Sequence, residues 1–310
     1  SKGVAILSDL PITSAAKVVN RFCGSSMDAV HQVSQSINSG DSIAGIAAGV
    51  EDMFQVPMGG FNPSFHPELY EKEYYIGMGE TAENLAKELN ISREEQEEFA
   101  VESHEKALKA IDAGLFKNEI VPIDFNGETV SVDEGPRKPD LDKIKSLDPA
   151  FDVNGTITPA TSSPISIGAS AALLVSESLA KELGLSYEFK VLARSVAGVD
   201  WTVMGSGPIP ATEKALKKSG LSISDIDVIE LNEAFAAQSL ACIRKLGLKD
   251  NDPRINPNGG AIALGHPLGA SGTRILQTAA IELQKKNKKY ALVTMCIGVG
   301  QGYATIIKKV

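Results

Sequence analysis

Two cysteines, Cys23 and Cys296, and one histidine, His266, stand in small-residue turns where side chains can do chemistry. Cys23 opens the run Cys-Gly-Ser-Ser between a short apolar stretch and a predicted helix. Free N–H groups and the helix dipole at such a position favour the thiolate. The small neighbours let a thioester approach the sulfur closely. A buried, inert cysteine is the alternative interpretation, and the flanking Gly and Ser residues favour the reactive one.

His266 lies in the sequence Gly-His-Pro, between Gly-rich turns and ahead of a predicted helix. A lone histidine is more often structural, but such a turn can hold an imidazole rigidly as a base and hydrogen-bond donor. Cys296 follows a predicted strand and precedes a Gly-rich loop, in which free amides such as that of Gly298 can form an oxyanion hole. One thiol as nucleophile, the imidazole as its activator and the other thiol as acid and base predict acyl transfer through a thioester.

Asn232 stands where a predicted strand becomes a helix. It is either the N-cap of that helix or the holder of a water in the site, and the two roles are compatible. We interpret His31, His104 and Cys242 as helix residues without chemistry, and His66 as a loop residue. No CxxC or His/Cys ligand spacing is present, which argues against a zinc site. The Gly-rich run does not follow the strand–helix order of a dinucleotide site.

The elements that must position these residues alternate between strands and helices. Ser92 and Glu95 form the capping box of a long predicted helix that Gly114 ends. Apolar residues at steps of three and four predict another helix, which Gly40 ends. Strands are predicted at 18–22, 42–49, 171–175, 189–196, 228–231 and 290–295, with 44–50 and 169–175 buried, and further helices at 210–219, 233–246 and about 270–285.

This alternation predicts a mostly parallel, layered α/β architecture. A second set of elements begins near Tyr187, and the surroundings of His266 repeat the pattern around Cys23 in element type. We therefore predict two halves of related topology, residues 1–185 and 186–310. The first half contains an irregular loop excursion at about 51–165.

Composition excludes several classes of protein. The 310 residues carry a formal net charge of −9, which argues against a broad basic footprint for nucleic acid. No apolar run reaches the roughly 18 residues of a transmembrane helix, and no secretory signal opens the chain. An odd count of three cysteines predicts a reducing compartment, so we expect a cytoplasmic protein.

Five motifs in order resemble the successive signatures of thiolases: VNRFCGSSMDAV, GMGETAENLA, NEAFAAQ, NPNGGAIALGHPLGASGTR and CIGVGQG. The resemblance runs from about residue 8 to the C-terminus. VEDMFQVPM, SFHPEL and CIGVGQG are most similar to the bacterial degradative 3-ketoacyl-CoA thiolases, the β subunits of fatty-acid oxidation complexes. The biosynthetic acetyl-CoA acetyltransferases are the alternative branch, although they usually have a longer loop and a further Gly at Val299.

The resemblance implies the thiolase fold and a role for each site residue. Cys23 becomes the acylated nucleophile, His266 activates it and donates to the thioester oxygen, and Asn232 holds a water in the same oxyanion hole. Cys296 protonates the departing acetyl-CoA enolate, and the amides of Cys23 and Gly298 form a second oxyanion hole. The positions that match the lining of the pantetheine and acyl channel are Met78, Ser163, Met204 and Phe235.

The implied reaction is thiolytic cleavage of 3-ketoacyl-CoA in fatty-acid β-oxidation, with coenzyme A as co-substrate and no permanently bound cofactor. The implied assembly is a homodimer core that docks on a hydratase/dehydrogenase α subunit. Two features depart from the family. Ile167 replaces a common Asp, and a front segment with an early Arg-Thr-Pro motif is absent, so the N-terminal half reads as truncated. A truncated, non-catalytic subunit that only binds partners is therefore a further alternative.

Overall fold

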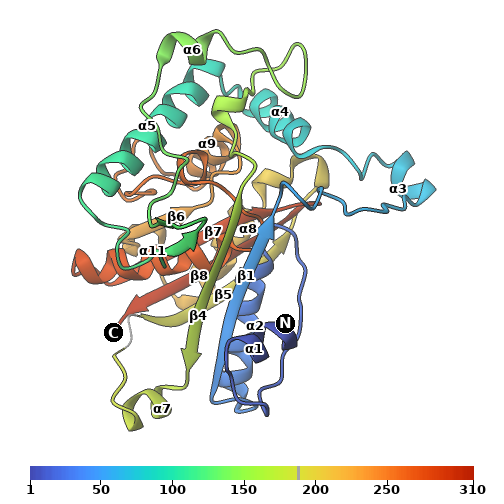
Figure 1. Ribbon diagram of the computed structural model, residues 1–310. Coiled ribbons are helices and arrows are strands. Elements are labelled where there is room, and N and C mark those ends of the chain that lie inside the picture. The colour runs from blue at the N-terminus through green and yellow to red at the C-terminus, as the bar shows by residue number, and fades with distance from the viewer. Residues whose placement is uncertain (187–188) are drawn as a thin grey trace.

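The computed structural model describes residues 1–186 and 189–310, so the predicted start of the second half near Tyr187 lies outside the described residues. Two principal sheets are packed with helices (Figure 1). The helices are α1 (Lys2–Leu7), α2 (Ser25–Ser39), α3 (Pro67–Glu71), α4 (Met78–Leu89), α5 (Arg93–Asp112), α6 (Leu141–Lys145), α7 (Glu177–Glu182), α8 (Pro208–Ser219), α9 (Ala236–Lys245), α10 (Ala261–Leu264) and α11 (Ser271–Lys285). The strands are β1 (Ala44–Asp52), β2 (Ile123–Phe125), β3 (Glu128–Val130), β4 (Ile167–Val175), β5 (Phe189–Gly198), β6 (Val228–Leu231), β7 (Tyr290–Ile297) and β8 (Gln301–Lys309).

The larger sheet has the strand order β5-β8-β7-β6 and lies inside the protein. Alternate residues of β7 enter two separate clusters of buried side chains. Leu292 and Cys296 face the cluster that α8 and α9 supply, whereas Val293 and Met295 face the cluster of α2 and α11. Strand β7 is therefore covered on both faces, which is the reason for its continuous apolar sequence. Among the named strands of the described residues, β6 and β7 are the one parallel pair, so the expectation of mostly parallel strands is wrong.

The smaller sheet pairs β1 with β4 in antiparallel fashion, and helix α2 packs against it. Both segments are strands, as expected, but the expectation that they are buried is wrong. Ala47 is fully buried, but Val50, Ile167 and Leu173 are each more than 60% exposed. Burial depends on which faces are covered, and helices cover only one face of this two-stranded sheet in the structure.

Helix ends follow the sequence signals closely. Helix α2 ends at Gly40 in the left-handed conformation (φ 82°), and Ser92 and Glu95 form the capping box of α5. The predicted strand at 18–22 is wrong, because the structure has there only an isolated bridge between Arg21 and Cys23. The helix expected from Glu233 begins three residues later, and β8 was not predicted.

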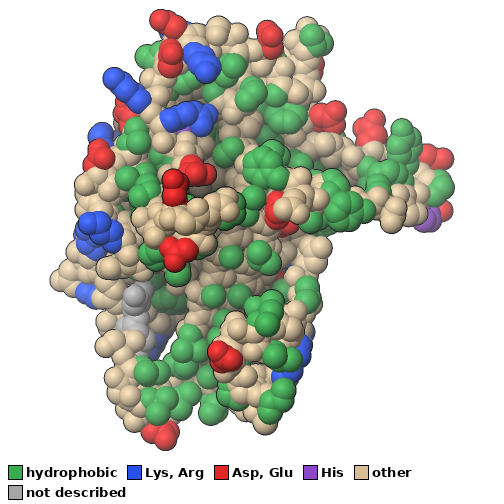
Figure 2. Space-filling model, viewed as in Figure 1, with side chains coloured by type: hydrophobic (Ala, Val, Ile, Leu, Met, Phe, Trp, Pro, Cys, Tyr) green, Lys and Arg blue, Asp and Glu red, His purple; other side chains and the backbone are tan. Residues whose placement is uncertain are grey.

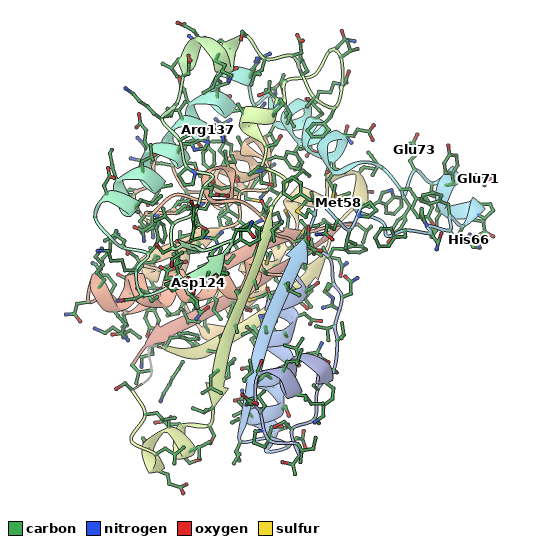
Figure 3. All side chains as sticks on the ribbon, viewed as in Figure 1. Met58, His66, Glu71, Glu73, Asp124 and Arg137 are labelled. Carbon is green, nitrogen blue, oxygen red and sulfur yellow. The ribbon has the colours of Figure 1, made fainter. Side chains whose placement is uncertain are left out.

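Residues 53–77 form an arm that projects from the body and carries α3 (Figure 1). Exposed apolar side chains gather on the arm, among them Phe61, Phe65 and Tyr70 (Figure 2). His66 lies near the tip together with acidic side chains, far from the sheets (Figure 3). The interpretation of His66 as a loop residue outside the chemistry agrees with this position.

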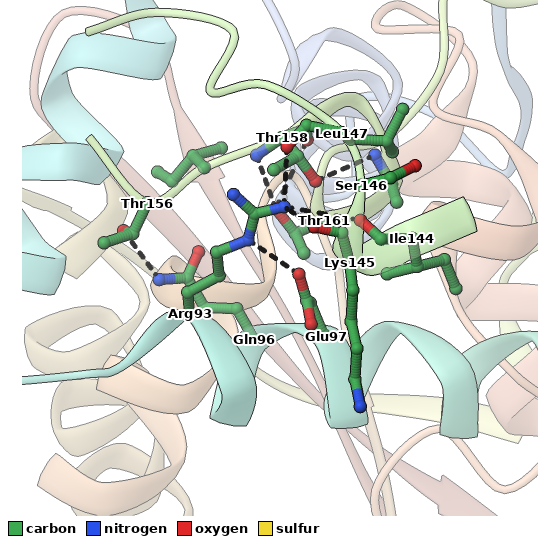
Figure 4. Close-up of polar contacts among 12 residues, drawn as sticks. Arg93, Gln96, Glu97, Ile144, Lys145, Ser146, Leu147, Thr156, Thr158 and Thr161 are labelled. Carbon is green, nitrogen blue, oxygen red and sulfur yellow. Dashed lines mark hydrogen bonds and ion pairs between the residues drawn. The ribbon is translucent and has the colours of Figure 1, made fainter. Parts of the chain in front are cut away.

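The remainder of the excursion folds back over α4 and α5, and two groups of contacts hold its last part. At the first, the Arg93 guanidinium donates to three carbonyl groups at the end of α6 and to Glu97 at 2.7 Å (Figure 4). The three carbonyl groups belong to Ile144, Lys145 and Leu147. At the second, the buried Glu83 carboxylate of α4 accepts from the amides of Thr156 and Ile157. These contacts fix residues 144–157, the segment that precedes Ser163.

Segments far apart in the sequence meet through glycines with no room for a side chain. A Cβ at Gly49 of β1 would lie 1.9 Å from the carbonyl oxygen of Gly269, and one at Gly272 of α11 would lie 2.5 Å from the amide nitrogen of Met27. Helices α2 and α11 therefore approach each other backbone to backbone. No helix in the described ranges is long and apolar enough to cross a lipid bilayer.

Candidate active site

Cys23 sits in a tight turn just before α2. The preceding residue, Phe22, has a left-handed backbone (φ 47°), which is rare for a bulky side chain and marks stored strain. Hydrogen bonds hold this turn: Asn20 Oδ1 accepts from the Phe22 amide at 3.0 Å, and Ser25 Oγ donates to the Phe22 carbonyl at 2.7 Å. The strained turn aims the sulfur inward, and Cys23 is only 8% exposed.

The Cys23 thiol is protonated at neutral pH. Burial raises its pKa to about 11, although hydrogen bonds from the Gly298 amide and from its own amide act in the opposite direction, and the Glu51 carboxylate raises it further. The expectation that the turn favours the thiolate is therefore wrong, because desolvation outweighs the N–H groups of the turn. A base must remove the proton when the sulfur attacks.

His266 can supply that base. Its Nδ1 lies 2.6 Å from Ser271 Oγ, and this hydroxyl donates to the carbonyl oxygen of Pro267 at 3.0 Å. Ser271 Oγ must then accept from Nδ1–H, which assigns the Nε2 atom as the unprotonated nitrogen. Burial, assisted by the positive charge of Arg274, lowers the pKa of His266 to about 3. The imidazole is thus neutral, with its basic nitrogen in a fixed direction.

Asn232 is next to this imidazole. It follows β6 directly, and its Nδ2 lies 3.2 Å from His266 Nε2. Helix α9 takes Phe235 as its N-cap, so the N-cap interpretation of Asn232 is wrong. Its Oδ1 is buried without a hydrogen-bond partner among the described residues, which leaves that oxygen free to accept from a bound molecule.

Cys296 and Gly298 come from the end of β7 and the turn to β8. Cys296 is fully buried, and burial raises the pKa of its thiol well above the ordinary value, with a further contribution from the nearby Cys23 sulfur. A Cβ at Gly298 would lie 3.6 Å from the Phe22 ring and 3.7 Å from Met78 Sδ. The structure therefore brings Cys23, Gly298 and Met78 together at one point.

The other residues expected to line a channel lie close by. Phe235 and Met204 are buried in the cluster that contains Cys296, and Met78 packs against the same cluster. The Ser163 amide donates to the carbonyl group of Ala234 at 3.0 Å. Phe235 thus lies in the segment between β6 and α9, Ser163 bonds to that segment, and Met78 and Met204 pack in or against the cluster that contains Cys296.

Sequence reasoning missed two contributors to the site. Phe151, between the two attachments of the excursion, meets Phe235 edge-on at 5.8 Å and covers Gly79, where a Cβ would lie 2.1 Å from its ring. Ser271, which fixes the tautomer of His266, is one of several small residues in the motif. A lone aromatic residue at the end of a polar stretch is the only sequence signal for Phe151.

The residue after Asn232 joins three segments around the site. The buried Glu233 carboxylate accepts from Ser103 Oγ of α5 at 2.7 Å, from Asn256 Nδ2 at 2.7 Å and from the Ile262 amide at 3.2 Å. Glu233 thereby ties the Gly-rich loop that leads to His266 to helix α5. A Cβ at Gly260 would lie only 2.1 Å from this carboxyl group, so the loop passes against it.

Two buried thiols, a neutral imidazole and an amide donor at the nucleophile define a cysteine-dependent acyltransferase. Comparisons with known proteins specify its family. The N-terminal domain of thiolase matches residues 1–178, and the C-terminal domain of thiolase matches residues 186–309. The chain belongs to the thiolase family, and its α/β fold is the thiolase fold, as the motifs implied.

Named relatives agree with this assignment. The chain is 48% identical to a 3-ketoacyl-CoA thiolase of Serratia proteamaculans over 320 residues, which cover 100% of this chain and 82% of the relative. It is 49% identical to a Vibrio cholerae 3-ketoacyl-CoA thiolase over 319 residues, with the same coverage. The human mitochondrial 3-ketoacyl-CoA thiolase, solved in complex with CoA, superposes with a TM-score of 0.93 at 37% identity and covers 100% of this chain and 82% of that chain.

Proposed function

We propose that this acyltransferase cleaves 3-ketoacyl-CoA by thiolysis to acetyl-CoA and a shortened acyl-CoA, through an acyl thioester on Cys23. The observation that carries the proposal is the Cys23 sulfur, which accepts from the Gly298 amide in a turn beside the second buried thiol. Relatives that are 48–49% identical and named 3-ketoacyl-CoA thiolase support the degradative direction over the biosynthetic alternative and over a non-catalytic subunit.

In the first half of the reaction, His266 Nε2 takes the proton from the Cys23 thiol and the sulfur attacks the 3-keto carbon. The bond between the α and β carbons then breaks. The acyl group stays on Cys23, and the electron pair leaves with the acetyl-CoA enolate. Cys296 gives its proton to this carbanion, which releases acetyl-CoA and leaves the Cys296 thiolate. His266 in its protonated form and a water held by Asn232 stabilise the thioester oxygen of the enolate.

In the second half, the Cys296 thiolate takes the proton from the thiol of a second coenzyme A. The resulting thiolate attacks the acyl group on Cys23, and the amides of Cys23 and Gly298 stabilise the oxyanion of the tetrahedral intermediate. The shortened acyl-CoA leaves, and the Cys23 sulfur recovers its proton from His266. All proton carriers thus return to their starting states.

The burial of both thiols fits this ping-pong cycle. A thiol whose pKa burial raises remains protonated at neutral pH, so Cys296 can act as the acid that the carbanion needs. Once deprotonated in the same dry site, it becomes a strong base for the next thiol. The raised pKa of Cys23 likewise makes its sulfur a strong nucleophile after His266 has removed the proton.

The proposal includes the binding path and the assembly. Met78, Ser163, Met204 and Phe235 line the path of the pantetheine and acyl groups, and coenzyme A is a co-substrate. The functional unit is a homodimer in the cytoplasm, docked on a hydratase/dehydrogenase subunit. The halves are residues 1–185 and 186–310. Three free cysteines support a reducing compartment.

Mass spectrometry after incubation with acetyl-CoA tests the nucleophile. The expected result is one acetyl group on Cys23 in the wild-type chain and none in Cys23→Ser. Cys242→Ser is the matched control, because Cys242 is also fully buried but lies in α9 with its thiol bonded to the Gly205 carbonyl. Absence of acetylation in the wild type would favour the non-catalytic subunit.

Kinetics with two substrates test the direction. Thiolysis of 3-ketohexadecanoyl-CoA should proceed with a higher kcat/KM than thiolysis of acetoacetyl-CoA. A clear preference for the short substrate would favour the biosynthetic acetyltransferase instead.

A further inference from the structure

A polar triangle outside the reaction scheme lies directly behind the nucleophile. The Tyr303 hydroxyl of β8 donates to Asp28 Oδ1 at 2.5 Å and accepts from the Arg21 guanidinium. Arg21 and Asp28 also form an ion pair at 3.5 Å. Arg21 lies two residues before Cys23, and Asp28 is in the first turn of α2. The triangle therefore connects both sides of the strained turn to one residue of the central sheet.

The Tyr303 ring supports the same turn by packing. The residue is 1% exposed, and a Cβ at Gly24 would lie 2.9 Å from the ring, so the backbone after Cys23 rests against it. His31 of α2 meets the ring edge-on at 4.7 Å, and its Nε2 lies 2.7 Å from Thr305 Oγ1 of β8. The ring and the hydroxyl of Tyr303 are thus both fixed, the ring by helix α2 and the hydroxyl by the charged pair.

We propose that Tyr303 is a positioning residue for the nucleophile: through Arg21, Asp28 and Gly24 it holds the left-handed turn that sets the Cys23 sulfur against the Gly298 amide. The inference rests on the proposed role of Cys23 as nucleophile. Phe22 at φ 47° is costly for a bulky residue and persists only where the surroundings impose it. The triangle supplies this constraint on the side of the turn that faces β8.

The consequence for chemistry follows from the hydrogen bond that the sulfur receives. An amide N–H that points at the sulfur stabilises the thiolate relative to the thiol. A turn that relaxes by a fraction of an ångström weakens this bond without changing the channel in which coenzyme A would lie. The charge that acts on the Cys23 sulfur is that of Glu51 of β1, and the other titratable thiol near it is Cys296 of β7; both belong to elements outside the triangle.

Tyr303→Phe tests the inference, because it removes the hydroxyl and keeps the ring. The pH dependence of Cys23 alkylation by iodoacetamide should shift upward by about half a unit to one unit, which corresponds to one weakened hydrogen bond to a charged group. The kcat of thiolysis should fall about tenfold, while the KM for coenzyme A stays within about twofold. A loss of packing alone would lower stability without moving the alkylation profile.

Two further variants make the result decisive. Asp28→Asn removes the charge from the triangle and should shift the alkylation profile in the same direction; it decides the question if Tyr303→Phe does not fold by circular dichroism. Tyr290→Phe, at the far end of β7 from Cys296, is the matched control and should leave profile and kcat unchanged. If Tyr303→Phe folds and has the wild-type alkylation profile and kcat, the inference is overturned. If Tyr303→Phe does not fold, the same result for Asp28→Asn overturns it.

The proposed function fails in a different way. If Cys23→Ser still becomes acetylated, the nucleophile assignment is wrong and the inference about its positioning falls with it. If Cys23→Ser loses acetylation while the triangle variants behave as wild type, only the role of Tyr303 is refuted.

Discussion

Replacement of Ser271 by Ala tests whether the tautomer of His266 is set by a single hydroxyl. Ser271 Oγ is 2.6 Å from Nδ1 and at the same time donates to the Pro267 carbonyl at 3.0 Å, so it presents a lone pair and no proton to the imidazole. Without the hydroxyl, the buried Nδ1–H has no acceptor at that position. The ring then loses the contact that directs Nε2 as the base.

The magnitude follows from the burial of this contact. His266 is 2% exposed, so water cannot readily replace the lost acceptor. An unpaired buried donor costs about 1–3 kcal/mol, and the upper part of this range applies when the imidazole becomes charged in the transition state. A loss of this size corresponds to a decrease of about 5- to 150-fold in kcat. The KM for coenzyme A should change by less than about twofold, because Ser271 does not face the channel.

Steady-state thiolysis, with kcat and KM measured separately, is the assay. Thr278→Val is the matched control: it also removes a hydroxyl from α11, two turns along the helix from Ser271, where that hydroxyl donates to Glu119 at 2.6 Å. We expect this control to lower the free energy of unfolding and to leave kcat unchanged. Wild-type kcat in Ser271→Ala, or equal losses of kcat in both variants, would refute the reasoning about the tautomer.

Two further predictions concern stability. Burial lowers the pKa of His31 and of His266 to about 3 and that of His104 to about 4, from an ordinary 6.5. Below pH 6.5 these histidines bind protons in the unfolded chain but stay neutral in the folded chain. The free energy of unfolding should therefore fall by up to about 1.4 kcal/mol per pH unit for each histidine. Urea denaturation at several pH values measures this slope, and His31→Gln should reduce it by about one third; an unchanged slope would contradict the assignment. Gly272→Ala, where α2 and α11 touch, should destabilise the protein by about 1–3 kcal/mol, whereas Gly3→Ala, with nothing within 4 Å, should not; equal melting temperatures for the two variants would show that the helices can separate without cost.

Several helix ends could be predicted from sequence, because they depend on local patterns. The Ser92–Glu95 capping box and the end of α2 at Gly40 are local hydrogen-bond patterns and were confirmed. The exposure of β1 and β4 could not be predicted, since small apolar residues in a strand do not show how many of its faces are covered. The antiparallel pairing of β8 is a long-range property of the same kind.

The protonation state of the Cys23 thiol could not be predicted from the sequence, because it too depends on long-range packing. A position before a helix predicts a lowered thiol pKa, and the N–H groups are indeed near Cys23. Their effect is smaller than the desolvation of the thiol in the buried cluster that it shares with residues of α2, α11 and β7. Ser271 was equally hidden, because its role depends on one 2.6 Å contact made within a run of small residues.

The glycine contacts between the two parts of the chain constrain which substitutions can accumulate in evolution. Gly49 belongs to the first half and meets Gly269 of the second, while Gly272 of the second half meets Met27 of the first. The backbones of the two parts are therefore in direct contact. A side chain gained at Gly49 or Gly272 would clash with the backbone of the other part. A chimaera that joins the first half of this chain to the second half of a relative can assemble its catalytic centre only when both partners keep these bare positions. At these contacts the two parts of the chain therefore have to change together.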